Sequence, residues 1–304
     1  MGDLSDTRDQ DRTMDTQTHS KADLLLRILR NPFVTIAVLY VSLYYVNFAG
    51  LAYMLMLAKG PVMPLLTGVM TTANLLLVYC AYAYFVERRP VSEFALPHMG
   101  RELGIGLLLG FGLMTTCVLI AMAAGIYRLE GLDSMQNLLP TGVALALPFF
   151  EEMVFRGIVF RLVQQKYGSW VAFVISSLVF GAVHATNEGE TFAGVAAIAF
   201  VYGPMLAAPF MLTRRLWMSI GLHGAWNYTM GKVYDIPISG TPGEGLFKAT
   251  FEGPELLTGG SAGMEGSVIA FVVGIAATVL MLIIAVRSGN IVPSPSNRGI
   301  TRPT

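Results

Sequence analysis

The sequence predicts an all-α, polytopic membrane protein with about eight transmembrane helices. The chain of 304 residues is 54% hydrophobic and only 13% charged, whereas soluble domains carry roughly 25% charged residues. Apolar segments of about 20 residues, long enough to cross a hydrocarbon core of about 30 Å, recur along the chain. They are 33–57, 62–86, 103–127, 141–160, 168–187, 191–213, 216–231 and 266–286. The seventh is the weakest, because small and polar residues interrupt it.

The two ends of the chain differ from this apolar domain, which covers residues 31–288. Residues 1–30 begin with polar residues of mixed charge that show no periodicity, which predicts a disordered tail on the cytoplasmic side. Residues 289–304 are rich in Pro and Ser and predict a second disordered tail. The formal net charge of zero argues against a nucleic-acid partner. The expected surroundings are therefore the lipid bilayer.

Basic residues concentrate on one side of the predicted spans, and such residues favour the cytoplasmic side. They precede the first span or follow the second, fourth, sixth and eighth: Lys21, Arg27, Arg30, Arg88, Arg89, Arg101, Arg161, Lys166, Arg214, Arg215 and Arg287. We therefore expect an integral protein of the cell membrane with both termini in the cytoplasm. The loops near Lys59, Glu188 and Gly243 are then external.

A few polar side chains interrupt the predicted spans. Ionisable groups inside a bilayer each cost about 3 kcal/mol or more and are functional candidates. The polar residues within the spans are Glu151, Glu152 and Arg156 in the fourth, His184 in the fifth, and His223 with the uncharged Asn227 in the seventh. These residues are the candidates for a site inside the membrane.

The spacing in the fourth span separates its two glutamates. Glu152 and Arg156 are four residues apart and stack on one helix face, which predicts an ion pair. Glu151 points about 100° away from its neighbour and has no basic partner four residues later. Pro148 lies three residues before Glu151 and is expected to bend the helix and open space there. One carboxylate is thus neutralised locally and the other is left for chemistry.

The other polar positions also fall on shared helix faces. His223 and Asn227 are four residues apart, as are Phe180 and His184. A buried carboxylate, two histidines and a carboxamide on three helices could activate a water molecule. The alternative is structural, because a single His or Asn in a membrane helix usually forms interhelical hydrogen bonds.

The third span contains a GxxxG pattern from Gly106 to Gly110. Small residues at this spacing allow two helix backbones to approach closely. We expect this pattern to mark a helix–helix contact and not a binding site.

Three motifs follow each other along the chain: EExxxR at 151–156, FxxxH at 180–184 and HxxxN at 223–227. Together they resemble the CPBP family of intramembrane proteases, which includes CAAX-prenyl endopeptidases and bacteriocin-immunity proteins. The resemblance covers roughly residues 141–234 and fits the predicted eight spans. It implies that residues 31–288 form a transmembrane protease domain with this segment as its core.

The resemblance also implies an activity and a set of roles. The activity is hydrolysis of a peptide bond in a membrane-bound protein or peptide. Glu151 and His184 would activate the water, and His223 with Asn227 would stabilise the oxyanion. The pair formed by the second glutamate and the arginine would hold the site together.

CAAX processing takes place on cytoplasmic C-termini, whereas the predicted topology places His184 toward the external face. A membrane-bound peptide or protein is therefore favoured over a prenylated substrate. Two other functions use the same residues. One is a proton- or ion-coupled transporter with midplane acids and histidines, although no internal repeat or pair of broken helices supports it. The other is a non-catalytic membrane immunity protein.

No cofactor is favoured, and zinc is the alternative. Its ligands would be Glu151, His184 and His223, since carboxylate and imidazole are ordinary zinc ligands. The sequence lacks the HExxH helix signature, and its candidate histidines lie on separate helices. An arginine beside the glutamates would also oppose a dication. Family members have been described as metalloproteases and as glutamic proteases, so the resemblance leaves both types open.

Overall fold

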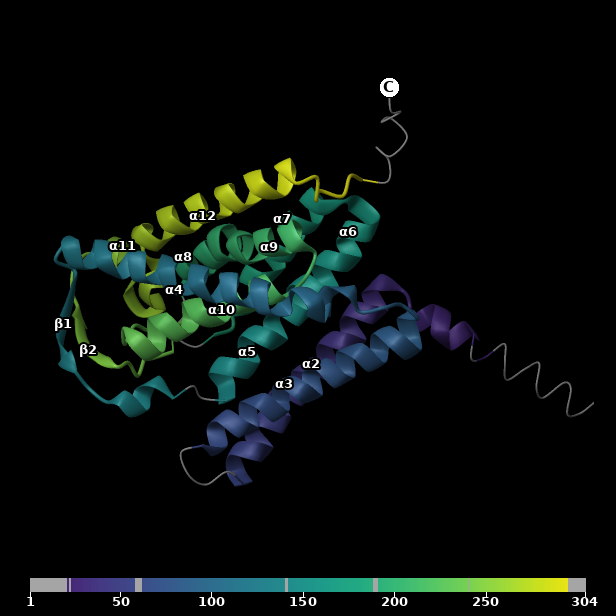
Figure 1. Cartoon of the computed structure of the whole chain (residues 1–304), viewed down its shortest axis with the longest axis horizontal. Helices are drawn as coiled ribbons and strands as arrows, with labels where there is room; N and C mark the ends of the chain where they lie inside the picture. Colours follow the sequence, from purple (N-terminus) through teal and green to yellow (C-terminus); the bar gives the residue numbers. More distant parts are fainter. Residues whose placement is uncertain are drawn as a thin grey trace, which may run out of the picture.

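The computed structural model describes residues 21, 23–57, 62–139, 142–187, 191–239 and 241–294. The tail residues 1–20 and 295–304 lie outside these ranges. The described chain is helical almost throughout (Figure 1), and this confirms the all-α membrane fold class.

Each predicted membrane span is helical over most of its described residues. The helices are α2 (Pro32–Leu57), α3 (Met63–Tyr82), α4 (Met99–Ala123), α5 (Gly142–Glu152), α6 (Arg161–Tyr167), α7 (Ser169–His184), α8 (Phe192–Ala197), α9 (Gly203–Thr213), α10 (Trp217–Tyr228), α11 (Glu255–Thr258) and α12 (Val268–Arg287). Segments with π-helical hydrogen bonding extend or join them at Ala83–Glu87, Met153–Phe160, Ile198–Tyr202 and Thr229–Val233. Short 3₁₀ turns lie at Ser92–Phe94, Leu96–His98, Met135–Leu138 and Gly260–Gly266.

Five segments of the described chain are helical, long and apolar enough to cross a membrane: Pro32–Gly50, Met63–Glu87, Ser92–Ala123, Phe192–Thr213 and Gly260–Arg287. Helix α7 is apolar but shorter. The helical segments that carry the EExxxR and HxxxN motifs do not meet this criterion. The first contains several charges, and the second spans only residues 217–233. The number of eight transmembrane helices therefore stays a prediction.

The third helix ends earlier than the sequence predicts. Gly125 adopts a φ of +72°, which ends the helix, and Tyr127 begins strand β1 (Tyr127–Leu132). This strand pairs antiparallel with β2 (Phe247–Phe251), in a Gly-rich region where no element was predicted. Burial and the nearby charge of Asp235 raise the pKa of Tyr127. Its protonated hydroxyl donates a hydrogen bond of 2.7 Å to the Tyr234 carbonyl.

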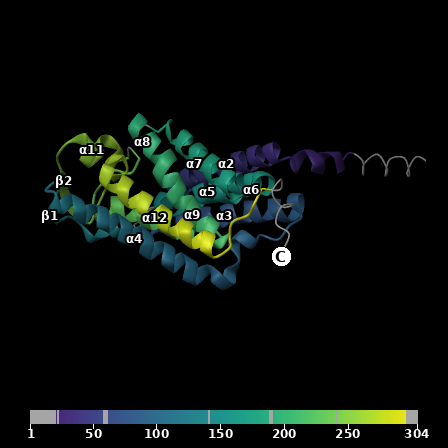
Figure 2. The same cartoon turned by 90° about the horizontal axis from the view of Figure 1, so that it is seen from above.

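The other helices pack around α5 and α10, which carry the two glutamates of the first motif and the whole of the third motif. Helix α10 packs against α4, α5 and α9, while α12 covers α9 and α4. The hairpin of α2 and α3 packs on α5, and Figure 1 shows it on the side of the molecule opposite α12. The view from above in Figure 2 shows α12 running beside α9. The hairpin is thus an outer element that reaches the core from one side.

The predicted GxxxG contact is confirmed, and it lies between α4 and α10. A Cβ atom on Gly106 would lie 2.4 Å from the Met218 carbonyl oxygen. One on Gly110 would lie 2.4 Å from the Leu222 carbonyl oxygen. These distances are shorter than any tolerated contact, so both glycines are required by the close approach. The contact fixes the position of α10, which carries His223.

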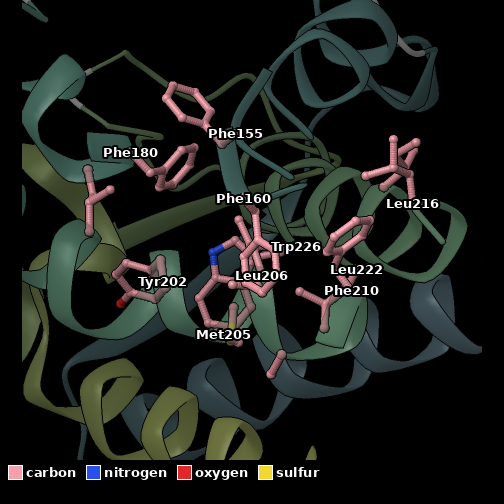
Figure 3. Packing of buried hydrophobic residues seen from close by; sticks show 14 of the residues in the cluster. Phe155, Phe160, Phe180, Tyr202, Met205, Leu206, Phe210, Leu216, Leu222 and Trp226 are labelled. Atoms are coloured by element: carbon pink, nitrogen blue, oxygen red, sulfur yellow. The ribbon is translucent and has the colours of Figure 1, made fainter. Parts of the chain in front are cut away.

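Buried aromatic side chains pack between the helices that carry the motifs and their neighbours (Figure 3). The Phe155 ring lies 5.0 Å from the Phe180 ring of α7 in an edge-to-face contact. Tyr202 and Trp226 pack with their ring centroids 5.5 Å apart. Such pairs add about 0.5–1.5 kcal/mol beyond the area they bury. The motifs are therefore held in one rigid core.

Part of the predicted C-terminal tail is held against this core. The Ser169 amide donates to the Val292 carbonyl at 2.9 Å, and the Val292 amide donates to Ser169 Oγ at 2.9 Å. Asn290 Nδ2 donates to the Leu212 carbonyl at 2.6 Å. Residues 290–292 therefore lie along the start of α7 and the end of α9.

Candidate active site

Helix α5 and the π-helical segment after it position the first motif. Glu151 and Glu152 form the last two residues of α5, and Pro148 lies inside this helix. Arg156 lies within the π-helical segment Met153–Phe160, all of whose residues are buried. Single π-helical turns are rare and occur frequently at functional sites.

The predicted pair of Glu152 and Arg156 is present. Arg156 Nη1 lies 2.9 Å from Glu152 Oε1, and both side chains are fully buried. Arg156 Nη2 donates to the Gly203 carbonyl at 2.8 Å. Its guanidinium carbon lies 4.6 Å from the centre of the Phe180 ring. The arginine thus links the first motif to α7 and α9.

His223 reaches both glutamates from α10. Its Nδ1 lies 2.9 Å from Glu152 Oε1, and its Nε2 lies 3.5 Å from Glu151 Oε2. Among the described residues, Glu151 has no basic partner on its own helix, as the spacing predicts, but it has a neighbour on α10. Helix-face spacing considers only neighbours on the same helix, and here a different helix supplies the partner.

His184 is the last residue of α7 and lies on a different wall. Its Nδ1 lies 2.7 Å from the carbonyl oxygen of Phe180. Because a carbonyl oxygen only accepts, Nδ1 carries the hydrogen, and in the neutral ring Nε2 is the acceptor. The Phe180 ring lies 4.7 Å from the His184 ring and 6.1 Å from the His223 ring. This phenylalanine therefore contacts both histidine rings.

One cavity of about 800 Å³ collects the polar motif residues. Its walls include Glu151, His184, His223 and Asn227. The Glu152–Arg156 pair is fully buried behind this wall. The arrangement separates four groups that line the cavity from two that lie buried behind them.

Two other walls of the cavity carry none of the three sequence motifs. One is aromatic and is formed by Tyr40, Tyr44 and Phe48 of α2 together with Phe150. In the sequence, only the spacing of four residues between the three α2 aromatics points to a shared helix face. The other wall is polar and comes from the π-helical segment after α10 and from the Gly-rich region that follows it: Lys232, Ser239, Thr241, Glu244 and Glu265. No motif marked it.

The donor groups do not form a ready metal centre. Across the described ranges, no group of three or more His, Cys, Asp or Glu side chains is placed to hold a metal ion. The zinc set of Glu151, His184 and His223 would require these side chains to move together. In their described positions, these residues do not fit a resident zinc ion.

The fold and the site define a helical membrane protein with a carboxylate- and imidazole-lined cavity among its helices. Residues 133–229 match the family model of the Rce1-like type II CAAX prenyl endopeptidases. This match contains all three motifs and confirms the resemblance to the CPBP family. The family is one of intramembrane proteases. Comparison with curated proteins and with solved structures gave no match.

Proposed function

We propose that the protein is an intramembrane endopeptidase of glutamic type that hydrolyses a peptide bond in a membrane-associated protein or peptide. The observation that carries the proposal is the shared cavity of Glu151, His184, His223 and Asn227. The match of the surrounding segment to a protease family supports it. The reaction needs a water molecule, a base, donors for an oxyanion and an acid for the leaving amine.

Glu151 is the proposed base and later the acid. Its carboxylate takes a proton from water while the water oxygen attacks the carbonyl carbon of the substrate. His184 holds the same water through Nε2, because the Phe180 carbonyl keeps the hydrogen on Nδ1. The carbon–nitrogen bond then breaks, and the proton on Glu151 passes to the leaving nitrogen. No net change occurs in the enzyme.

His223 and Asn227 are the proposed oxyanion donors. The contact with the Glu152 carboxylate places a hydrogen on Nδ1 of His223. Nε2 can then donate only when the ring is protonated. In that state the net charge of Glu151, Glu152, Arg156 and His223 together would be zero. Proton transfer to Glu151 neutralises that carboxylate and releases Nε2 for the oxyanion. Donors fixed in such a site contribute about 3–4 kcal/mol.

Peptide profiling of membranes tests the activity itself. Membranes that contain the wild-type protein should yield peptides that are missing from membranes with Glu151→Ala protein. A transporter would show no such products and would lose flux in liposomes. Equal peptide profiles from the two membranes would remove the proposed function.

The purified protein should stay active in 1,10-phenanthroline, because the proposed mechanism uses only side-chain acids and donors. Elemental analysis should find far less than one zinc per chain. A reversible loss of activity with the chelator, restored by zinc alone, would instead identify Glu151, His184 and His223 as ligands.

We also propose that the cavity mouth faces away from the cytoplasm, since its polar loops are those that the basic-residue asymmetry makes external. A cysteine at the exposed Glu244 should react with an impermeant reagent in intact cells, whereas a cysteine at Arg287 should react only after lysis. The native Cys80 and Cys117 are half-buried and buried, which keeps the background low. The reverse labelling pattern would invert the topology. The loops near Lys59 and Glu188 lie outside the described residues.

A further inference from the structure

The aromatic wall of the cavity is a continuous ridge on α2. Tyr40, Tyr44 and Phe48 are spaced four residues apart and therefore lie on one helix face. The ring centroids of Tyr40 and Tyr44 are 5.9 Å apart, and those of Tyr44 and Phe48 are 4.5 Å apart. We call these three residues the α2 ridge.

The α2 ridge contacts the residue that precedes the proposed catalytic carboxylate. All three of its rings contact Phe150, with centroid distances of 6.4, 6.4 and 5.9 Å. Phe150 is buried and immediately precedes Glu151 in α5. The ridge lines the same cavity as Glu151. A substrate group that touches the ridge is therefore next to the site of attack.

Two rings of the ridge are also partly exposed. Tyr44 is 48% exposed and Phe48 is 42% exposed, on a helix that is apolar enough to cross the membrane. The loop-lined part of the cavity differs in chemistry. There Lys232 pairs with Glu244 at 3.1 Å, and Glu265 accepts a hydrogen bond of 2.7 Å from Ser239. One cavity thus has an apolar, membrane-side wall and a charged, loop-side mouth.

We propose that the α2 ridge is the specificity-determining subsite for the bulky apolar residues that lie beside the scissile bond. This inference rests on the proposed function and specifies its substrate. The substrate is a membrane-inserted peptide in which a run of bulky apolar residues adjoins a polar segment. The apolar run lies on the ridge, the polar segment lies at the mouth, and cleavage occurs at the boundary between them.

Selectivity in proteoliposomes tests the subsite. The probes are two synthetic quenched-fluorescent peptides with the same Ser/Lys/Glu segment, joined to a run rich in either Leu and Phe or Ala. The double variant Tyr44→Ala/Phe48→Ala should lower kcat/KM for the Leu/Phe peptide about tenfold or more, mainly through KM, and should affect the Ala peptide less. Tyr45→Ala is the matched control, because Tyr45 is 71% exposed on the same helix and does not line the cavity. It should leave both rates unchanged.

An equal loss for both peptides would show a merely structural role for the ridge and would overturn the inference. The inference would also fail if Tyr45→Ala changed selectivity as much as the double variant. A third peptide, with a lipid chain in place of the apolar run, separates the sources of apolar contact. If the double variant lowered kcat/KM most for this lipid-bearing peptide, the ridge would be a site for a lipid group, and the proposed peptide subsite would be rejected.

Crosslinking separates this inference from the proposed function, because it requires no turnover. A photoreactive phenylalanine at position 44, in otherwise wild-type protein, should crosslink the Leu/Phe peptide, and the same group at position 45 should crosslink it far less. Crosslinking at 44 without any cleavage would retain the subsite and reject the protease. Cleavage without selective crosslinking at 44 would reject the subsite and retain the protease.

Discussion

Replacing Glu151 with glutamine should lower the rate of peptide cleavage by about 10²–10⁴-fold, the usual contribution of a general base. Glutamine keeps the shape of the side chain but cannot take a proton from water. The Glu152–Arg156 pair stays intact in this variant, and the polar contact of Glu151 in the described part of the chain is a long one, 3.5 Å to His223 Nε2. The variant should therefore still fold and accumulate in the membrane.

The measurement is the initial cleavage rate of purified protein in proteoliposomes, with thermal unfolding followed in parallel. Glu252→Gln is the matched control, because it makes the same chemical change at an exposed position outside the cavity. His184→Ala should resemble Glu151→Gln, since the described hydrogen bond of His184 is to its own helix. Full activity in purified Glu151→Gln protein would remove this carboxylate from the mechanism.

Replacing Arg156 with alanine should destabilise the protein by about 3–5 kcal/mol in addition to abolishing activity. The change leaves the Glu152 carboxylate in a site with no solvent exposure and without its guanidinium partner. It also removes the hydrogen bond to the Gly203 carbonyl and the contact with the Phe180 ring. Loss of a buried charge partner is among the few single changes with so large an effect.

The free energy of unfolding in mixed micelles measures this effect. The matched control is the double variant Glu152→Gln/Arg156→Met, which removes both charges and nearly preserves volume. Replacing a whole buried pair by neutral groups is often close to neutral in stability. The double variant should therefore be more stable than Arg156→Ala and still inactive. Unchanged stability in Arg156→Ala would mean that the pair contributes nothing to the fold.

The sequence predicted those features of the site that depend on one helix. The spacing of Glu152 and Arg156 is local, so their ion pair could be derived from helix geometry. The close approach at Gly106 and Gly110 was equally readable, because only small residues permit it. The helical segments followed from apolar length alone.

Which residues of one helix meet which residues of another could not be derived in this way. The bridge from His223 to the two glutamates depends on how α10 is docked, and helix periodicity carries no such information. The α2 ridge was equally hidden, because an aromatic stripe with helical spacing has the same pattern whether it faces lipid or a cavity. The β1–β2 ribbon was missed because its strands are short and lie far apart in sequence.

The buried pair of Glu152 and Arg156 behind the cavity is only partly satisfied by hydrogen bonds. Glu152 Oε2 and Arg156 Nε are buried without a hydrogen-bond partner in the described part of the chain. Buried polar atoms in this state cost free energy, and a partly satisfied network is usually less stable than an apolar core. A functional role for the pair is consistent with this cost.

A single oxygen atom, Glu152 Oε1, accepts hydrogen bonds from both Arg156 Nη1 and His223 Nδ1, each at 2.9 Å. Replacing either Arg156 or His223 changes the electron density and the position of that oxygen, and so changes the hydrogen bond that the remaining residue makes. The free-energy changes of the two replacements are therefore coupled and will not add in a double-mutant cycle. Folding stability and the alignment of His223 toward Glu151 consequently both depend on Glu152 Oε1. A substitution that changes only the stability, or only the alignment, has to lie elsewhere in the protein.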